Sequence, residues 1–539
     1  MRYSKSAMRS NRFITLFAGI LITLFIALPF VQKHFFSAQN SYSIIENKMR
    51  TMNQILYHVN ELYFEDINME KLMDGAFSGI MKELDPHSIY IPAKKQKDVD
   101  ELFRGKFQGI GIEFDILNGY ITVISPVADS PSERAGLLPG DQITAIDGED
   151  AYNITKEDVY QTLRGARGTS VDLMIRRIGG EEFPVTIIRD DIPIYSVRAA
   201  TMFDEKTGYI WLTRFSASTS KEMKASLEKL EELGMTQLIL DLRMNSGGYL
   251  EQAAETANMF IARPDTLVFT KGKQKKLEQV FIANPKKGRE DFPLIILINR
   301  GSASASEIVA GAVQDLDRGL IAGETSFGKG LVQRQVPMND GSAIRVTIAR
   351  YFTPSGRLIQ RPYEDGKDHN YYKELYADNR EAKIDSLKEL RPKYQTRSGR
   401  IVYGGGGITP DKYIPQTFTP KTGTQKVLAN SKRPLFNWGS NYANEYWNEL
   451  VDFNSFKNST FSDNELESFF NYLSEEEIVA DTADLNSDRD YLVTMLRAEI
   501  ASARWGKDEA FGIRIHADNQ IMTAFSYFNE ATAFLQSSQ

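Results

Sequence analysis

The chain has 539 residues and no cysteine, which excludes disulfides, thiolate metal sites and a cysteine nucleophile. It is longer than one ordinary domain, so roughly three or four units are expected. Its formal net charge of −7, with 25% charged and 42% hydrophobic residues, is ordinary for a globular protein and gives no support for nucleic acid as a partner.

The N-terminus combines a basic segment with an apolar one. Residues 1–12 contain four basic residues and are expected to stay cytoplasmic, and residues 13–31 contain no charge. The apolar stretch is close to the roughly 20 residues that cross a bilayer, so we expect an inner-membrane anchor with the rest of the chain on the periplasmic side of a bacterial cell envelope. The alternative is a cleaved signal peptide, which would release the protein into the periplasm.

The next two regions differ in their hydrophobic period. Residues 41–100 carry apolar side chains at three- and four-residue intervals, which predicts helices. Residues 101–192 predict a β-rich module, because short strands alternate with glycine turns. The expected strands are Ile110–Phe114, Tyr120–Ile124, Gln142–Ile146 and Val171–Ile175.

Residues 193–415 alternate apolar strands with helices. Continuous Ile and Leu runs are typical of strands buried on both faces, so a layered α/β core is expected. The strands are Tyr209–Leu212, Leu238–Asp241 and Leu294–Ile298, and the helices lie near Lys221–Leu233, near Leu250–Phe260 and from Ala305 onward.

The remaining segments are charged or helical. Glu364–Arg400 is poor in large apolar residues and is expected to form an exposed excursion. Residues 416–539 predict a helical C-terminal domain. One of its helices begins with the capping box of Ser462 and Glu465.

Two small-residue loops in the α/β region carry a serine and a lysine. Ser304 precedes an expected helix, whose unpaired N–H groups and dipole favour a developing negative charge. Lys329 lies between two glycines. A serine hydroxyl needs a neighbouring base, and a lysine can act as one when burial lowers its pKa. Since none of the five histidines lies between Asp204 and Arg350, lysine is the expected base.

Other residues of the same region fit this chemistry. Gly247 and Gly248 follow an expected strand, and either N–H could complete an oxyanion hole with that of Ala305. Gln333, four residues after Lys329, could hold the lysine in place. Each feature alone has an ordinary explanation, such as a turn or a solvated lysine. Together, in one α/β core, they indicate a serine hydrolase.

The chain resembles the C-terminal processing peptidases, also called tail-specific proteases, between about residues 45 and 415. The matching stretches are Leu84–Ser88, the β-rich module, Gly208–Ser216, Asp241–Gly248, Gly301–Ile308, Gly323–Gln333 and Tyr351–Gly356. This resemblance implies that Ser304 is the nucleophile, Lys329 the base and Gln333 the residue that orients it. It also implies a crotonase-like or ClpP-like core that needs no metal or cofactor.

The resemblance further implies that residues 101–192 form a PDZ domain, and the residues agree. Gly109, Ile110, Gly111 and Ile112 form the kind of loop whose N–H groups capture the terminal carboxylate of a peptide that adds as a strand. The run Ser130-Pro-x-x-x-Ala135-Gly-Leu-x-Pro-Gly-Asp141 is a further mark of this domain.

The sequence therefore predicts a multidomain α/β endopeptidase with Ser/Lys catalysis. We expect it to bind protein or peptide substrates by their C-termini, to cleave envelope proteins, and to act as a homo-oligomer or with an adaptor protein. One alternative is a catalytically inactive PDZ scaffold or chaperone, against which intact Ser304, Lys329 and Gln333 argue. Another is an acyl-CoA enzyme of the crotonase type, which should lack a PDZ domain.

Overall fold

The computed structural model describes residues 42–177, 180, 182–363 and 368–538. The chain divides into two compact units, residues 1–77 and 78–539. The expected membrane segment at residues 13–31 lies outside the described residues. Among the helices that are described, none combines the length and apolarity needed to cross a membrane.

The described residues of the first unit form helices, as expected, with a non-helical segment at residues 63–68. The remainder of the region expected to be helical, residues 41–100, contains a short strand at Ile89–Ile91. Residues 42–62 form a helix, and α2 (Met69–Lys82) begins in this unit and ends in the second. Several large apolar side chains of the 42–62 helix are exposed, among them Ile45 and Ile55.

In the second unit, β1 (Ile89–Ile91) and α3 (Ala93–Arg104) precede the β-rich module. Its main sheet is antiparallel in the order β3-β4-β5-β7-β8, so β3 is an edge strand. The bounds are β3 (Ile112–Leu117), β4 (Tyr120–Pro126), β5 (Gln142–Ile146), β7 (Ser170–Arg176) and β8 (Glu182–Ile188), with β6 (Glu149–Asp150) paired to β5. A separate pair joins β2 (Lys106–Gly109) to β9 (Asp190–Pro193), and the helices are α4 (Pro131–Arg134) and α5 (Lys156–Leu163).

The sheet of the α/β core has the order β10-β11-β12-β15-β16-β21, and all neighbours are parallel except β10 and β11. Three helices connect its strands: α6 (Thr219–Glu232), α7 (Leu250–Asn258) and α8 (Ala305–Asp315). The strands are β10 (Val197–Met202), β11 (Thr207–Leu212), β12 (Gln237–Asp241), β15 (Leu294–Ile298), β16 (Leu320–Gly323) and β21 (Lys412–Tyr413).

Both faces of this sheet are buried, which explains the continuous apolar runs of its strands. Successive side chains of a strand point to opposite faces. Leu238 and Leu240 accordingly pack with the apolar residues of α6, α7 and α8, whereas Ile239 packs in a second cluster on the other face.

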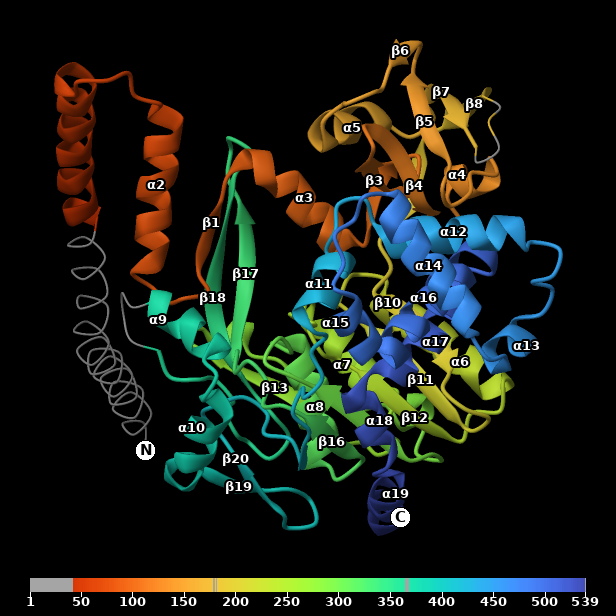
Figure 1. Cartoon of the computed structure of the whole chain (residues 1–539). Helices are drawn as coiled ribbons and strands as arrows, with labels where there is room; N and C mark the ends of the chain where they lie inside the picture. The colour runs from red at the N-terminus through yellow and green to blue at the C-terminus, as the bar shows by residue number, and fades with distance from the viewer. Residues whose placement is uncertain (1–41, 178–179, 181, 364–367, 539) are drawn as a thin grey trace, which may run out of the picture. The chain divides into compact units, whose positions relative to one another are not determined.

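C-terminal residues supply that second cluster. Ile521 on α18 (Asn519–Phe525) and Phe528 on α19 (Phe528–Ser538) pack with Ile239 and Ile295 of the sheet. Figure 1 shows α17 and α18, in blue, near this sheet, where α17 contacts β10 and α18 contacts β15 and β16. The C-terminal region therefore completes the protease core, although it lies outside the stretch that carries the family resemblance.

Other C-terminal helices have a core of their own, built around Phe469, Leu492 and Leu496. The capping box at Ser462 and Glu465 is present. The helices are α11 (Thr422–Leu428), α12 (Pro434–Glu445), α13 (Phe453–Asn458), α14 (Asp463–Glu475), α15 (Thr482–Ser487) and α16 (Arg489–Arg504). In a smaller cluster, α17 (Lys507–Arg514) packs against α16.

A second, antiparallel sheet was not predicted from the sequence. Its order is β1-β18-β13-β14, and β17 also pairs with β18. β17 and β18 mix polar and apolar residues, and β1 and β14 have only three residues each, so neither kind of strand gives a long apolar run. The bounds are β13 (Thr266–Gly272), β14 (Val280–Ile282), β17 (Leu331–Pro337) and β18 (Ala343–Phe352).

The expected exposed excursion is partly buried, which corrects the prediction. It contains α9 (Asp368–Lys373), α10 (Arg380–Ser386), β19 (Lys393–Gln395) and β20 (Ile401–Tyr403). Tyr371, Leu375 and Arg380 are buried. The Arg380 guanidinium donates to the carbonyls of Thr325 and Ser326 at 2.9 and 2.7 Å, so this segment supports the loop that precedes Lys329.

Candidate active site

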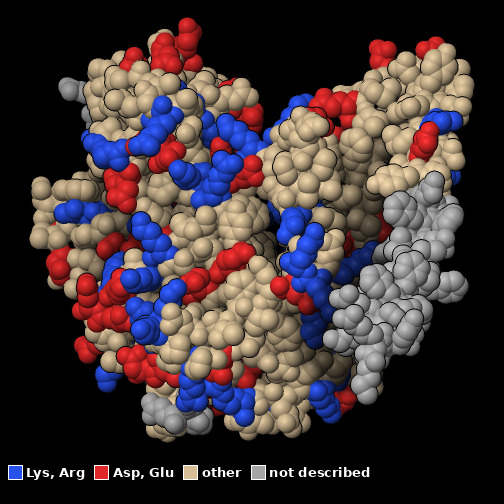
Figure 2. Space-filling view, turned by 180° about the vertical axis from the view of Figure 1, so that it is seen from behind, with Lys and Arg blue, Asp and Glu red and all other residues tan. Residues whose placement is uncertain are grey.

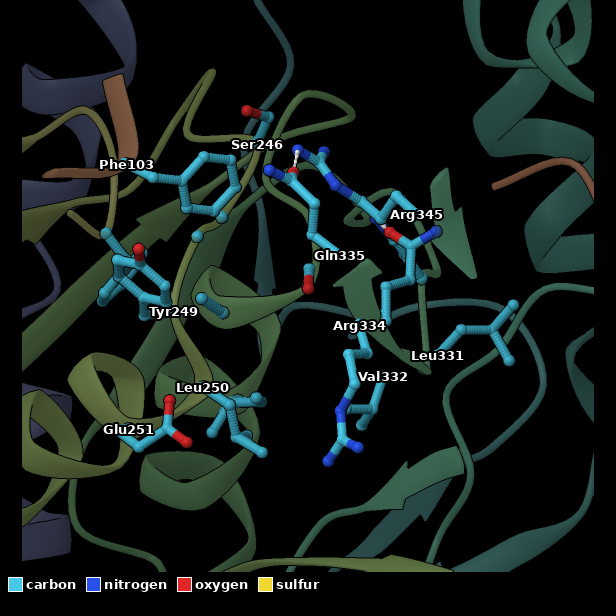
Figure 3. Close-up of a pocket in the computed structure, with 18 of the residues that line it drawn as sticks. Phe103, Ser246, Tyr249, Leu250, Glu251, Leu331, Val332, Arg334, Gln335 and Arg345 are labelled. Atoms are coloured by element: carbon cyan, nitrogen blue, oxygen red, sulfur yellow. Dashed lines mark hydrogen bonds between the residues drawn. The ribbon is translucent and has the colours of Figure 1, made fainter. Parts of the chain in front are cut away.

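The predicted site residues of the core meet in one cleft of about 1030 Å³. Three separate loops contribute: Gly247 and Gly248 follow β12, Ser304 and Ala305 follow β15, and Lys329 precedes β17 with Gln333 on that strand. Because β12 and β15 are parallel neighbours, their carboxyl ends lie at the same edge of the sheet. Figure 3 shows the cleft between the β17 residues and the segment from Tyr249 to Glu251.

Ser304 has an unusual backbone conformation at the N-terminus of α8. Its φ of 55° and ψ of −108° lie where side-chain-bearing residues are strained, and such strain concentrates at functional sites. The hydroxyls of Ser302 and Ser306 are buried and donate to the carbonyls of Leu242 and Asn245 at 2.7 and 2.8 Å. Of these three serines, only Ser304 lines the cleft.

Lys329 lies in the wall of the cleft, and its ammonium donates to Gln333 Oε1 at 2.8 Å. Burial lowers the pKa of Lys329 to about 8, and repulsion from Arg345 acts in the same direction. Attraction by Glu307 and Asp85 opposes this shift. A substantial fraction of the lysine is therefore neutral in mildly alkaline solution, as a general base requires.

Gln333 is fixed at both ends of its amide. While Oε1 accepts from Lys329, Nε2 donates to the His87 carbonyl. An amide held in this way keeps an acceptor directed at the lysine. The geometry thus suits the orienting role predicted for Gln333, and in this arrangement the lysine bonds to Gln333 rather than to the Ser304 hydroxyl.

Glu307 joins the serine loop to the lysine loop, a role that the sequence reasoning missed. This fully buried carboxylate accepts from the N–H groups of Ser304, Gly328 and Lys329 at 2.8, 2.7 and 2.9 Å, and from the Ser326 hydroxyl. Burial raises the pKa of Glu307, and the four hydrogen bonds oppose that shift. Since all four partners donate, the carboxylate form fits the site. The S-x-x-E spacing from Ser304 was the available signal.

The two glycines predicted for the oxyanion hole differ in their bonding. The Gly247 N–H donates to Asn245 Oδ1 at 2.9 Å. The Phe215 N–H donates to the Gly247 carbonyl, and the Phe215 carbonyl accepts from the Tyr249 N–H. The N–H of Gly248, between these two residues, has no partner in the described part of the chain. This favours Gly248 as the second donor beside Ala305.

Gly247 has a steric reason to be glycine. Its φ is 100°, and a Cβ there would lie 2.9 Å from Ser304 Cβ and 3.0 Å from the Ala305 nitrogen. A larger residue would therefore displace the serine loop.

One histidine, His87, lies near the site because the fold brings it there. His87 is remote in sequence, yet its carbonyl accepts from Gln333. Its ring Nε2 hydrogen-bonds to the Tyr371 hydroxyl at 3.2 Å, and burial with repulsion from Lys329 lowers the pKa of His87 to about 3. The ring is therefore neutral, and it does not line the cleft that contains Ser304. The sequence argument from linear spacing missed this residue.

The predicted carboxylate loop connects β2 to β3. The hydroxyls of Ser132 and Ser130 donate to the carbonyls of Ile110 and Gly111 at 2.8 and 3.0 Å. In a trans peptide the following N–H points the opposite way, so the N–H groups of Gly111 and Ile112 face away from these serines. Gly111 has a φ of 84°, and a Cβ there would lie 2.3 Å from Ser130 Cβ.

Comparison with known proteins agrees with this geometry. Residues 206–366 match peptidase family S41, and residues 122–177 match the PDZ domain. A carboxy-terminal-processing protease of Bartonella bacilliformis is 37% identical over 327 residues, which cover 60% of this chain and 74% of that protein. The chain belongs to the carboxy-terminal processing proteases of family S41.

A second relative is also a carboxy-terminal processing protease. The carboxy-terminal processing protease CtpA of Bacillus subtilis is 33% identical over 356 residues, which cover 65% of this chain and 76% of that protein. A solved structure of a photosystem II D1 C-terminal processing protease is 26% identical, covers 66% of this chain and 84% of its own, and has a TM-score of 0.33. Family membership makes this chain a serine-type C-terminal processing protease with a PDZ domain, and it removes the crotonase-type alternative.

Proposed function

We propose that this protease is an exported endopeptidase that captures protein substrates by their C-termini and cleaves them with Ser304 and Lys329. One observation carries the catalytic part. Lys329, with its pKa lowered to about 8, is held by Gln333 in the same cleft as Ser304, which occupies a strained helix entry.

The reaction follows from these positions. Neutral Lys329 takes the proton of the Ser304 hydroxyl as Oγ attacks the carbonyl carbon of the scissile peptide bond. The N–H groups of Ala305 and Gly248 stabilise the oxygen that becomes negative. The lysine then gives its proton to the leaving amine, the C–N bond breaks, and an ester to Ser304 remains. Water, deprotonated by Lys329, hydrolyses this ester and restores the hydroxyl.

The PDZ domain supports the selection of substrates by their C-termini. β3 is an edge strand of its sheet, so an extended peptide can pair with it. The N–H groups of Gly111 and Ile112 then meet the terminal carboxylate. No metal ion or organic cofactor has a role in this scheme.

Residues 13–31 support a location in the cell envelope. An uncharged stretch preceded by basic residues suits an inner-membrane anchor or a signal peptide, with envelope proteins as substrates on the periplasmic side. The partners in this proposal are the protein or peptide substrate and either further copies of this chain or an adaptor protein.

Incubation of the full chain with an unfolded protein tests this function. The expected result is cleavage near the C-terminus, seen by mass spectrometry, which weakens when that terminus is amidated. Lys329→Ala should leave the substrate intact. Binding without cleavage by the wild type would support the inactive scaffold instead, and recovery of the protein in the cytoplasmic fraction of cells would contradict the proposed location.

A further inference from the structure

The cleft around Ser304 carries an excess of positive charge in a chain that is acidic as a whole. Five cationic side chains line it, and only two acidic ones do, Asp100 and Glu251. The cationic residues are Arg214, Lys276, Lys329, Arg334 and Arg345. The formal net charge of the chain is −7, so this local excess is opposite in sign to the whole.

None of the five cations has an ion-pair partner among the described residues, and the side chains of Arg214, Lys276 and Arg334 also make no hydrogen bond there. Arg345 differs, since it donates to Gln335 Oε1 at 2.9 Å, and Lys329 is held by Gln333. In Figure 3 the Arg334 guanidinium is joined to none of the residues drawn, whereas Arg345 bonds to Gln335. Arg334 and Lys276 are exposed, which makes their charges available to a ligand.

Lys276 belongs to a basic turn between β13 and β14. Lys273 and Lys275 precede it in this turn, Lys271 lies near the end of β13, and Glu278 is the one acidic residue of residues 273–279. All four lysines are exposed. Leu277 and Gln279 line the cleft together with Lys276, so this turn forms one of its walls.

The acidic residues of the cleft do not balance these charges. Asp100 forms an ion pair with Arg104, which does not line the cleft, at 3.8 Å, and the two acidic residues leave an excess of three formal positive charges in the lining. Figure 2 shows Lys and Arg interspersed with Asp and Glu over the face that it draws. The excess of positive charge in the cleft contrasts with this mixed face.

From this charge distribution we infer that the enzyme prefers substrates with an acidic side chain close to the scissile bond. The inference rests on the proposed function, because it assigns the occupant of that catalytic cleft. An acidic side chain beside Arg334 and Lys276 gains Coulomb attraction, and the cleft attracts acidic segments before they bind. An apolar or basic segment gains neither. Arg334 and Lys276 are thus specificity-determining residues.

The test uses three peptides that differ at one position within three residues of the cleavage site, where they carry Glu, Gln or Lys. At low ionic strength the full-length enzyme should cleave the Glu peptide with a kcat/KM about three to ten times that for the Gln peptide, since exposed charge pairs are individually weak. The preference should shrink at about 0.5 M salt, which screens exposed charges.

Substitutions test whether Lys276 and Arg334 cause the preference for an acidic side chain. In Lys276→Gln/Arg334→Gln the ratio of Glu to Gln peptide should approach one, and Lys276→Glu/Arg334→Glu should favour the Lys peptide. The control Lys221→Gln/Lys286→Gln removes two exposed cations that do not line the cleft, and it should keep the preference.

The outcomes separate this inference from the proposed function. Equal cleavage of the Glu and Gln peptides by the wild type overturns the inference and leaves the endopeptidase intact. A wild-type preference that persists in the double glutamate variant overturns the role of Lys276 and Arg334. Failure of the wild type to cleave any of the three peptides counts against the proposed function.

Discussion

The pH dependence of the reaction is governed by Lys329, because only its neutral form accepts a proton. With a pKa of about 8, about a tenth of the side chain is neutral at pH 7, about half at pH 8 and about nine tenths at pH 9. At the ordinary pKa of 10.5 the neutral fraction at pH 7 would be about 0.0003. Burial therefore raises the active fraction roughly 300-fold at pH 7.

Single-turnover cleavage measured from pH 6 to pH 10 checks this expectation. The rate should rise about tenfold per pH unit below 8 and level off above it. Lys329→Arg should be inactive across the range, because arginine keeps the charge and cannot act as a base.

Substitution of two neighbours of Lys329 should shift the pH midpoint of the rate in opposite directions. Arg345→Gln removes a repulsive charge and should move the midpoint to higher pH, whereas Glu307→Gln removes an attractive charge and should move it to lower pH. A rate independent of pH between 6 and 9, or normal turnover by Lys329→Arg, would refute the assignment of the base.

The remaining predictions concern stability and recognition. Glu307→Gln should lower the free energy of unfolding by about 2–4 kcal/mol in chemical denaturation, since an amide N–H₂ replaces an oxygen that accepts two hydrogen bonds; an unchanged value would contradict the role of this carboxylate. Ser304→Gly should be inactive yet about 1 kcal/mol more stable than Ser304→Ala, because glycine relieves the positive φ; equal stability would mean that no strain is stored there. Gly111→Ala should abolish binding of a C-terminal peptide in fluorescence anisotropy, whereas Gly136→Ala, with a similar φ and no atom within 4 Å of its Cβ, should retain it.

The parallel core could be predicted because its residues carry strong local signals. Leu294–Ile298 is an unbroken apolar run, and β15 has these bounds. Small-residue loops after such strands pointed to Ser304 and to the pair Gly247 and Gly248, and the structure then favoured Gly248. The approach of these loops came from the structure, in which β12 and β15 are parallel neighbours with their carboxyl ends at one edge of the sheet.

Other parts could not be predicted because they depend on contacts between distant segments. α5 has eight residues and buries only Val159 and Leu163. Two apolar positions are too few to reveal a helical period in the sequence. β8 contains Pro184, which argues against a strand.

The surroundings of the lysine show the same limit. His87 and Tyr371 are far from Lys329 in sequence, yet His87 bonds to Gln333 and Tyr371 bonds to His87. Nothing in the local sequence of the charged segment around Tyr371 indicated that contact.

The role of Ser304 is the central claim, and replacement of each serine in its loop tests it most directly. Ser302 and Ser306 are buried and bond to backbone carbonyls, while Ser304 lines the cleft. Single-turnover cleavage of one peptide by Ser302→Ala, Ser304→Ala and Ser306→Ala, each checked for folding by circular dichroism, should show activity lost only in the folded Ser304→Ala protein. Normal turnover by Ser304→Ala, with activity lost in a folded Ser306→Ala protein, would contradict the account.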